Sequence, residues 1–202
     1  MPFWLAERPL LLASKSEIRR ILLANVGIPV EIAPANIDER AIEQTAPSRD
    51  PGVVASLLAR EKARTIAAAR PARLVLGADQ TLALGAQRFT KPVDRDTARE
   101  QLLTLRGKAH ALHSAVALMQ EDTVLYEHCA VARLTMRDFS DDFLETYLDI
   151  AGTAATASVG GYQLENVGIT LFEKVEGDHF TILGLPMFPL LAEFRRMGAM
   201  AS

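Results

Sequence analysis

The stretch LVLGADQTLAL, residues 74–84, decides how the surrounding chain is interpreted. Its run of Leu and Val is typical of a buried β-strand, yet Gly77 and Asp79 interrupt that run. An unpaired carboxylate in such surroundings costs several kcal/mol or takes up a proton. Asp79 is therefore either the partner in a structural ion pair or an acid that the strand delivers into a cleft.

Helical and extended patterns alternate on both sides of this strand. Ser14 and Ser16 are candidate N-caps of a helix that stops at Gly27, and Asp50-Pro51 is a typical helix start. The other expected elements are strands at 9–13 and 29–33, a loop at 36–39, a return segment ending at Lys91-Pro92, a helix at 94–106, strands at 109–119 and 123–136, a helix at 140–150, a strand at 168–177 and a last helix after Pro186. This order predicts a mixed α/β fold, which we assign to one domain, residues 1–202, with two lobes.

Composition narrows the class of protein. Of the 202 residues, 49% are apolar and 23% are charged, as in soluble globular proteins. A net charge of -3 argues against a nucleic-acid partner. The one cysteine, Cys129, has no disulfide partner within the chain and no zinc-type spacing. The N-terminal apolar run is too short for a signal peptide, and no stretch approaches the roughly 20 apolar residues of a membrane span, so we expect a cytoplasmic protein without a membrane partner.

Two charged residues lie within apolar patterns. Lys62 lies four residues from Leu58 and from Ile66, and Val54 continues the same spacing. The lysine therefore belongs to the apolar stripe of a helix. A lysine whose stem packs while its ammonium reaches water is the more frequent explanation; the alternative is a cation that points into a cleft. For Asp79, ligands gather at the carboxyl ends of strands in α/β sheets, while a buried ion pair with an arginine remains an equal alternative.

Other charged residues are less informative. Arg19 and Lys91, taken singly, are typical of solvated surface charges, and Glu39 in a loop indicates nothing by itself. His110 and His113 form an H-x-x-H pair, but on a strand this spacing puts them on opposite faces, so they should not share a metal. No dinucleotide fingerprint, P-loop or nucleophile elbow is present.

A series of short blocks resembles the Maf family of nucleoside triphosphate pyrophosphatases, also called septum-formation-inhibitor proteins. In chain order the blocks are LLASKSEIRRILLANVGIPVEIAPANIDER, LAREKA, LGADQ, KPVD, GKAH, GGYQLENVGITLFEKVEGD and LGLP. The resemblance implies a mixed-sheet, two-lobed fold with a central cleft, similar to that of inosine triphosphate pyrophosphatases. It also implies hydrolysis of a nucleoside triphosphate to the monophosphate and pyrophosphate with a divalent cation, Mg²⁺ or Mn²⁺.

The resemblance assigns roles to the charged residues. It makes Asp79 the general base that activates water, Glu39 an acid near the metal or water, and these two carboxylates the metal ligands. The triphosphate ligands that it implies are Ser14, Arg19, Lys62 and Lys91, of which Lys91 also counts among the catalytic groups. Several cations and a metal suit a triphosphate and its leaving pyrophosphate. On an unbroken strand Asp79 and Gln80 face opposite sides, so both line one cleft only if the backbone bends, which Gly77 would permit.

The branches of the family differ at three positions, occupied here by Ile18, Gln80 and Glu165. Gln80, Glu165 and the block GITLFE match the 7-methyl-GTP branch, whereas the dTTP/UTP branch has Ser-Pro-Arg-Arg, Gly-Ala-Asp-Thr and a glutamine. A carboxylate accepts from both N1–H and the 2-amino group of guanine, while an amide suits uracil or thymine better. At position 18 the 7-methyl-GTP branch can have an aromatic residue that stacks on the methylated base, which Ile18 cannot do. Ser158 occupies the position of a lysine in the dTTP/UTP branch.

The resemblance therefore favours a guanine-type base such as 7-methyl-GTP, and an enzyme that clears modified nucleotides. A dTTP/UTP pyrophosphatase and a non-catalytic nucleotide-binding regulator of cell division are the alternatives. A dinucleotide-dependent oxidoreductase lacks its glycine fingerprint. Because the family often forms dimers, a homodimer is one expected state.

Overall fold

A single mixed sheet organises the chain in the computed structural model, which describes residues 3–202 and leaves the first two residues of the predicted domain outside. The strands of these residues are β1 Leu10–Leu12, β2 Val30–Ile32, β3 Val75–Leu84, β4 Gln87–Phe89, β5 Ala109–Gln120, β6 Thr123–Met136 and β7 Phe172–Glu176. Their order is β2-β1-β3-β5-β6-β7, with β4 paired to β3. β1 is parallel to β2 and β3, and the remaining pairs are antiparallel.

Helices begin after Asp50, Asp94 and Ser140 as predicted, each of which caps its helix, whereas Ser16 stands at the N-cap of the first helix without a side-chain cap hydrogen bond. The helices are α1 Glu17–Asn25, α2 Glu39–Gln44, α3 Pro51–Ala69, α4 Arg95–Leu105, α5 Asp141–Ala151, α6 Ala154–Ala157, α7 His179–Ile182 and α8 Met187–Arg196, with 3-10 turns η1 Val159–Gly161 and η2 Val167–Leu171. Asp50 accepts from the backbone N–H groups of Gly52 and Val53, which explains where α3 begins. No helix in residues 3–202 is both long enough and apolar enough to cross a bilayer.

Two expectations were wrong in detail. The loop at 36–39 is shorter than expected, because Asp38 accepts from the N–H of Ala41 and starts α2. The strand expected at 168–177 begins only at Phe172. A Cβ at Gly168 would lie 2.3 Å from the carbonyl oxygen of Gln163, so the chain folds back on itself there instead of extending.

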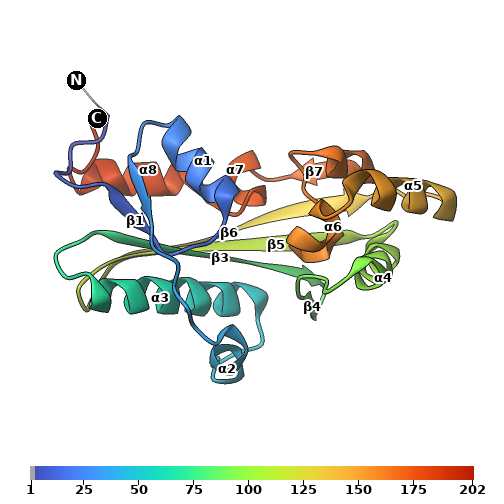
Figure 1. The fold of residues 1–202 in the computed structure, drawn as a ribbon, viewed down its shortest axis with the longest axis horizontal. Coiled ribbons are helices and arrows are strands. Elements are labelled where there is room, and N and C mark those ends of the chain that lie inside the picture. The colour runs from blue at the N-terminus through green and yellow to red at the C-terminus, as the bar shows by residue number, and fades with distance from the viewer. Residues whose placement is uncertain (1–2) are drawn as a thin grey trace.

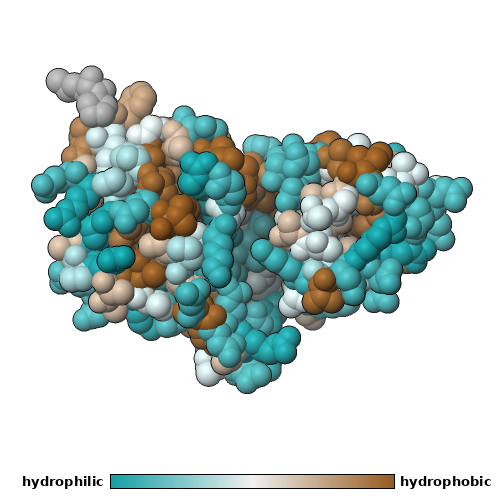
Figure 2. All heavy atoms as spheres, viewed as in Figure 1, coloured by the Kyte–Doolittle hydropathy of each residue, from teal (hydrophilic) through white to brown (hydrophobic). Residues whose placement is uncertain are grey.

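The sheet carries two lobes, which confirms the predicted architecture. In the first lobe, α1 and α8 cover one face and α3 covers the other, whereas α4, α5 and α6 gather over the far end of the sheet (Figure 1). β3, β5 and β6 run through both lobes. Each lobe has its own apolar core: the first contains Leu12, Leu23 and Phe194, and the second contains Leu102 and Leu134. The surface is hollowed between the two lobes (Figure 2).

Helix α3 lies unusually close to the sheet because its inner face is built of alanines. Ala59 and Ala63 are fully buried against β3. A Cβ at Gly77 would lie only 2.0 Å from the carbonyl oxygen of Ala59 and 2.8 Å from the nitrogen of Ala63. β3 continues through Gly77 from Val75 to Leu84, and Gly77 is not among the glycines with positive φ. The glycine serves helix–sheet contact instead of a turn.

His110 lies in the core of the second lobe and gives stability a pH dependence. It is 3% exposed, its Nε2 is 2.7 Å from Tyr162 Oη, and its Nδ1 has no partner. Burial lowers the pKa of His110 to about 4, below the unfolded value of about 6.5. The unfolded chain therefore binds the proton first, and the stabilisation present above pH 6.5 is lost as the pH falls towards 4.

We expect the free energy of unfolding to drop by about 2 kcal/mol between pH 7 and pH 4.5 because of this residue alone. Urea titrations at both pH values of the wild type and of His110→Gln, which can still bond Tyr162, measure it. The exposed His179 provides the control His179→Gln. An equal pH dependence in wild type and His110→Gln would contradict the assignment.

Candidate active site

A gap in the sheet beside β3 marks the site. β1 ends with Leu12 opposite Leu76, and β4 starts to pair only at Leu82. Between these points the edge of β3 has no strand partner among the described residues. Asp79 lies in this gap, beyond the carboxyl end of β1, where ligands bind in open α/β sheets.

Asp79 contacts a lysine that bridges it to a second carboxylate. Lys62 Nζ, from α3, is 2.5 Å from Asp79 Oδ1 and 2.8 Å from Glu39 Oε1 at the start of α2. Asp79 is 8% exposed. Burial raises the pKa of Asp79, and the positive charges of Lys62 and Arg19 oppose that rise. Lys62 therefore does not extend into free solvent, and Glu39, not the capping Asp38, reaches it.

Arg19 is buried beside the same gap. Its Nε donates to the carbonyl of Gly184 at 2.8 Å, and its Nη1 donates to Ser14 Oγ at 3.0 Å and to the carbonyl of Ala78 at 2.9 Å. Nη2 has no hydrogen-bond partner in residues 3–202, which leaves it available to an anion. Burial lowers the pKa of Arg19, and Asp79 and Glu39 counter that shift.

The structure brings together only some of the residues expected at the site. Ser14, Arg19, Glu39, Lys62 and Asp79 form a connected group. No side-chain hydrogen bond or ion pair in residues 3–202 joins the other expected residues to this group: Lys91 is exposed after β4, Glu165 is exposed between η1 and η2, Ile18 packs against the first core, and Gln80 faces the opposite side of β3 towards α7.

Sequence reasoning missed the backbone that surrounds Arg19. Gly184 has φ +87°, and a Cβ there would lie 3.1 Å from Arg19 Nη2. Gly184 lies in the sequence block LGLP, but the residue types in this block do not by themselves indicate a contact with Arg19. Ser14 was expected as a helix cap or phosphate ligand; its Oγ accepts from the N–H of Ser16 at 3.2 Å and from Arg19.

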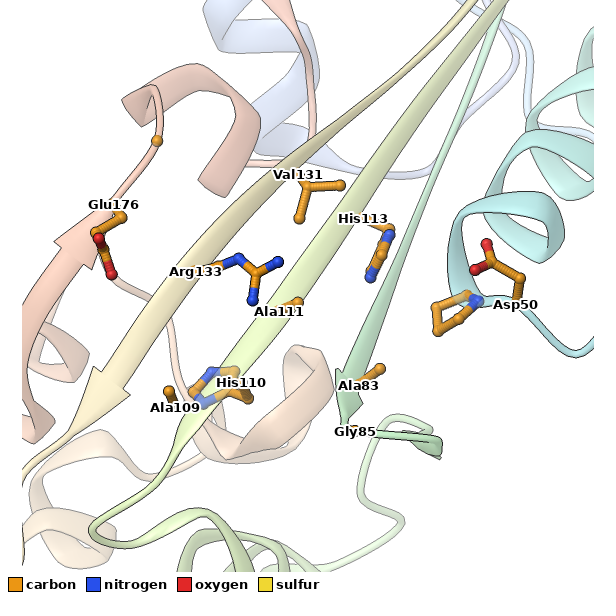
Figure 3. Close-up of a pocket in the computed structure, with 12 residues that line it drawn as sticks. Asp50, Ala83, Gly85, Ala109, His110, Ala111, His113, Val131, Arg133 and Glu176 are labelled. Atoms are coloured by element: carbon orange, nitrogen blue, oxygen red, sulfur yellow. The ribbon is translucent and has the colours of Figure 1, made fainter.

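A separate cavity of about 670 Å³ lies on the exposed sheet face of the second lobe. Asp50 borders it at one end and Glu176 at the other, with His113 and Arg133 along the strands between them (Figure 3). None of the expected site residues lines it. The buried acid with a raised pKa and the buried arginine lie in the gap beside β3, so we assign the chemistry to that gap.

The carboxylates of the gap suit a hard divalent cation. No group of three or more His, Cys, Asp or Glu residues could hold a metal within the described part of the chain. Mg²⁺, however, commonly takes one or two carboxylates and completes its shell with water and phosphate oxygens. Glu39 and Asp79 supply such a pair, with the Lys62 ammonium now between them.

A mixed α/β sheet with a buried acid and two cations at an interrupted edge is the arrangement of an enzyme that acts on an anionic substrate. The chain belongs to the Maf-like protein family, whose pattern matches residues 9–197. This confirms the family predicted from the sequence blocks.

Two proteins named as pyrophosphatases resemble the chain over most or all of its length. A Rhodopseudomonas palustris (strain HaA2) protein named nucleoside triphosphate pyrophosphatase is 51% identical over 201 residues, 100% of both chains. A Mesorhizobium japonicum protein named 7-methyl-GTP pyrophosphatase is 50% identical and covers 94% of this chain and 96% of that one. A solved HAM1 protein from Coxiella burnetii is similar over 65% of this chain and 74% of that one, with 12% identity and a TM-score of 0.39, too weak to bear on function.

Proposed function

We propose that the protein is a nucleoside triphosphate pyrophosphatase that releases the monophosphate and pyrophosphate and prefers a guanine-type base such as 7-methyl-GTP. The observation that carries the proposal is the contact of a buried Asp79 with Lys62, next to a buried Arg19, in the gap beside β3. Full-length relatives near 50% identity with pyrophosphatase names support the reaction class.

The cations hold the polyphosphate. A triphosphate carries about four negative charges, which must be matched where charge develops on the leaving group. Arg19 offers its free Nη2, and Lys62 exchanges its carboxylate partners for phosphate oxygens when the substrate binds. Lys91, on the exposed loop after β4, is the third cation of the proposal and reaches the phosphates from the other lobe.

Asp79 acts as the general base. As Lys62 turns to the phosphates, its hydrogen bond to Asp79 is released, and the carboxylate becomes free to accept a proton from water. The carboxylate takes a proton from water while the water oxygen bonds to the α-phosphorus. The bond from that phosphorus to the bridging oxygen breaks, and pyrophosphate leaves with both bonding electrons.

Glu39 and Asp79 are the residues that would hold Mg²⁺ or Mn²⁺. A divalent cation bound there supplies positive charge to the phosphate oxygens and lowers the pKa of a bound water. Glu39 comes from the short α2 and is more exposed than Asp79, with 52% of its side chain open against 11%. Glu39 therefore has more freedom to adapt to the bound ion.

Glu165 and Gln80 are the base-recognition residues of the proposal. Glu165 is exposed and makes no ion pair within residues 3–202, so its carboxylate is available to accept from N1–H and the 2-amino group of guanine. Ile18 contributes apolar surface from α1. The Mesorhizobium relative supports the 7-methyl-GTP preference.

The experiment is pyrophosphate release from GTP, 7-methyl-GTP, UTP and dTTP. We expect guanine nucleotides to have the highest kcat/KM, and Glu165→Gln to shift the guanine-to-pyrimidine ratio towards pyrimidines by about tenfold, since a good bidentate pair is worth about 1–3 kcal/mol. The exposed Glu173 gives the matched control Glu173→Gln, which should leave the ratio unchanged. Faster turnover of UTP than of any guanine nucleotide would contradict the base preference.

A further inference from the structure

Lys62 occupies the space between the two carboxylates that are proposed to hold the metal. Its Nζ is 2.8 Å from Glu39 Oε1 and 2.5 Å from Asp79 Oδ1, so a single ammonium contacts an oxygen of each. The side chain of Lys62 is only 12% exposed and that of Asp79 only 11%. Because water screens these charges poorly, they act on one another more strongly than the charges of a surface ion pair.

The packing of helix and sheet fixes where this ammonium can lie. Lys62 comes from α3, whose Ala59 and Ala63 are fully buried against β3, the strand that carries Asp79. The backbone of Lys62 therefore cannot retreat from Asp79. The ammonium leaves the carboxylates only by rotation of its own flexible four-carbon stem, and it does so when other anions replace them.

The charges of the gap balance one another in the free protein. Arg19 and Lys62 carry two positive charges, and Glu39 and Asp79 carry two negative charges when both are ionised. A divalent cation alone would add two positive charges beside two cations that are mostly shielded from water, with no anion to match them. A triphosphate brings about four negative charges and offers Lys62 new partners as it releases the carboxylates.

We infer that Lys62 is a built-in counter-ion that closes the metal site of the free enzyme, so that a divalent cation binds weakly until the triphosphate draws Lys62 away. This inference rests on the proposed function and deepens it, because it makes the complex of metal and nucleotide the substrate. The ion and the phosphates both favour the state in which Lys62 has left the carboxylates, so each strengthens binding of the other. Arg19 does not play this part, since Ser14 and two backbone carbonyls anchor its Nε and Nη1.

The test is Mn²⁺ binding to the nucleotide-free protein, followed by the electron paramagnetic resonance of unbound Mn²⁺. Lys62→Met keeps an apolar stem without the charge, and should tighten the dissociation constant for Mn²⁺ by about 5- to 150-fold, the usual range of coupling between sites. Lys62→Gln, which is uncharged but still donates hydrogen bonds, should act in the same direction if the methionine variant folds poorly. Lys62→Arg keeps the charge and should bind Mn²⁺ as weakly as the wild type.

Arg60→Met is the matched control, because it removes a positive charge from the same helix. Arg60 pairs with Glu127 at 2.5 Å and bonds neither proposed metal ligand in residues 3–202, so its loss should leave Mn²⁺ binding unchanged. Adding Glu39→Gln to Lys62→Met should abolish the gain, since Glu39 is one of the two ligands. A gain that survives Glu39→Gln, a gain equally large in Lys62→Arg, or no gain in Lys62→Met would overturn the inference.

A second measurement tests the coupling to the nucleotide. Calorimetry gives the affinity for α,β-methylene-GTP, whose α–β bridge resists hydrolysis, in the presence of Mn²⁺ and of a chelator. The gain from Mn²⁺ should be larger in the wild type than in Lys62→Met; binding of Mn²⁺ by the free nucleotide is the same for both proteins and cancels in the comparison. An equal gain would contradict the coupling. Neither measurement needs turnover, so an inactive wild type would refute the proposed reaction and still decide the role of Lys62.

Discussion

Replacing Asp79 with asparagine is expected to lower kcat for triphosphate hydrolysis by about 10²- to 10⁴-fold, the usual contribution of a positioned general base. Asparagine keeps the size of the side chain and loses the ability to accept the proton of water. Arg19, Lys62 and Lys91 are untouched, so affinity for the triphosphate should change little. Single-turnover rates and equilibrium binding, measured with the same nucleotide, separate the two effects.

Stability should move in the opposite direction to activity. Because burial raises the pKa of Asp79, its stabilising contribution is present below the unfolded pKa and is lost as the pH rises through the folded pKa. Asp79→Asn should therefore unfold at the same temperature as the wild type or above it, with an advantage that grows with pH. Lys62 keeps Glu39 as a partner at 2.8 Å, which limits the loss of the ion pair.

Asp122→Asn, at an exposed acid in the β5–β6 turn, is the control. It should alter neither kcat nor the unfolding temperature. Turnover of Asp79→Asn close to that of the wild type would refute the role of Asp79. A wild-type protein that binds nucleotides and releases no pyrophosphate would favour the regulator of cell division.

Gly77→Ala is expected to have the largest effect on stability, about 3 kcal/mol or more, through overpacking. The new Cβ would lie 2.0 Å from the carbonyl oxygen of Ala59, so α3 must move away from β3. The contacting atoms, the carbonyl oxygen of Ala59 and the nitrogen of Ala63, belong to the backbone, so no side-chain rotation can move them aside. Lys62 and Asp79 lie on these two elements, so their contact and the hydrolytic rate should be lost together with stability.

Urea-unfolding free energies measure the effect. Gly85→Ala is the matched control: a Cβ there meets no atom within 4 Å, and its φ of +59° adds only backbone strain, of about 1–2 kcal/mol. A Gly77→Ala protein no less stable than Gly85→Ala would show that α3 does not depend on the close approach.

Features that depend on neighbouring residues were predictable. Asp50 and Pro51 marked the start of α3 because a cap bonds to the backbone of the next few residues. The period of a strand placed His110 and His113, and likewise Asp79 and Gln80, on opposite faces. The ordered blocks identified the family over nearly the whole chain, which no single charged residue could do.

Contacts between distant segments were not predictable from such patterns. Lys62 fitted a snorkelling lysine as well as a functional one, and only the packing of α3 and α2 against β3 joins it to Asp79 and Glu39.

The sequence by itself determined the mixed α/β class, most element boundaries and the family, because capping, periodicity and motif order act over short spans of chain. Only the tertiary structure decided which carboxylates meet Lys62 and how Arg19 is anchored. Those features depend on distance and solvent exclusion between residues far apart in the chain, and both quantities arise only when the elements pack.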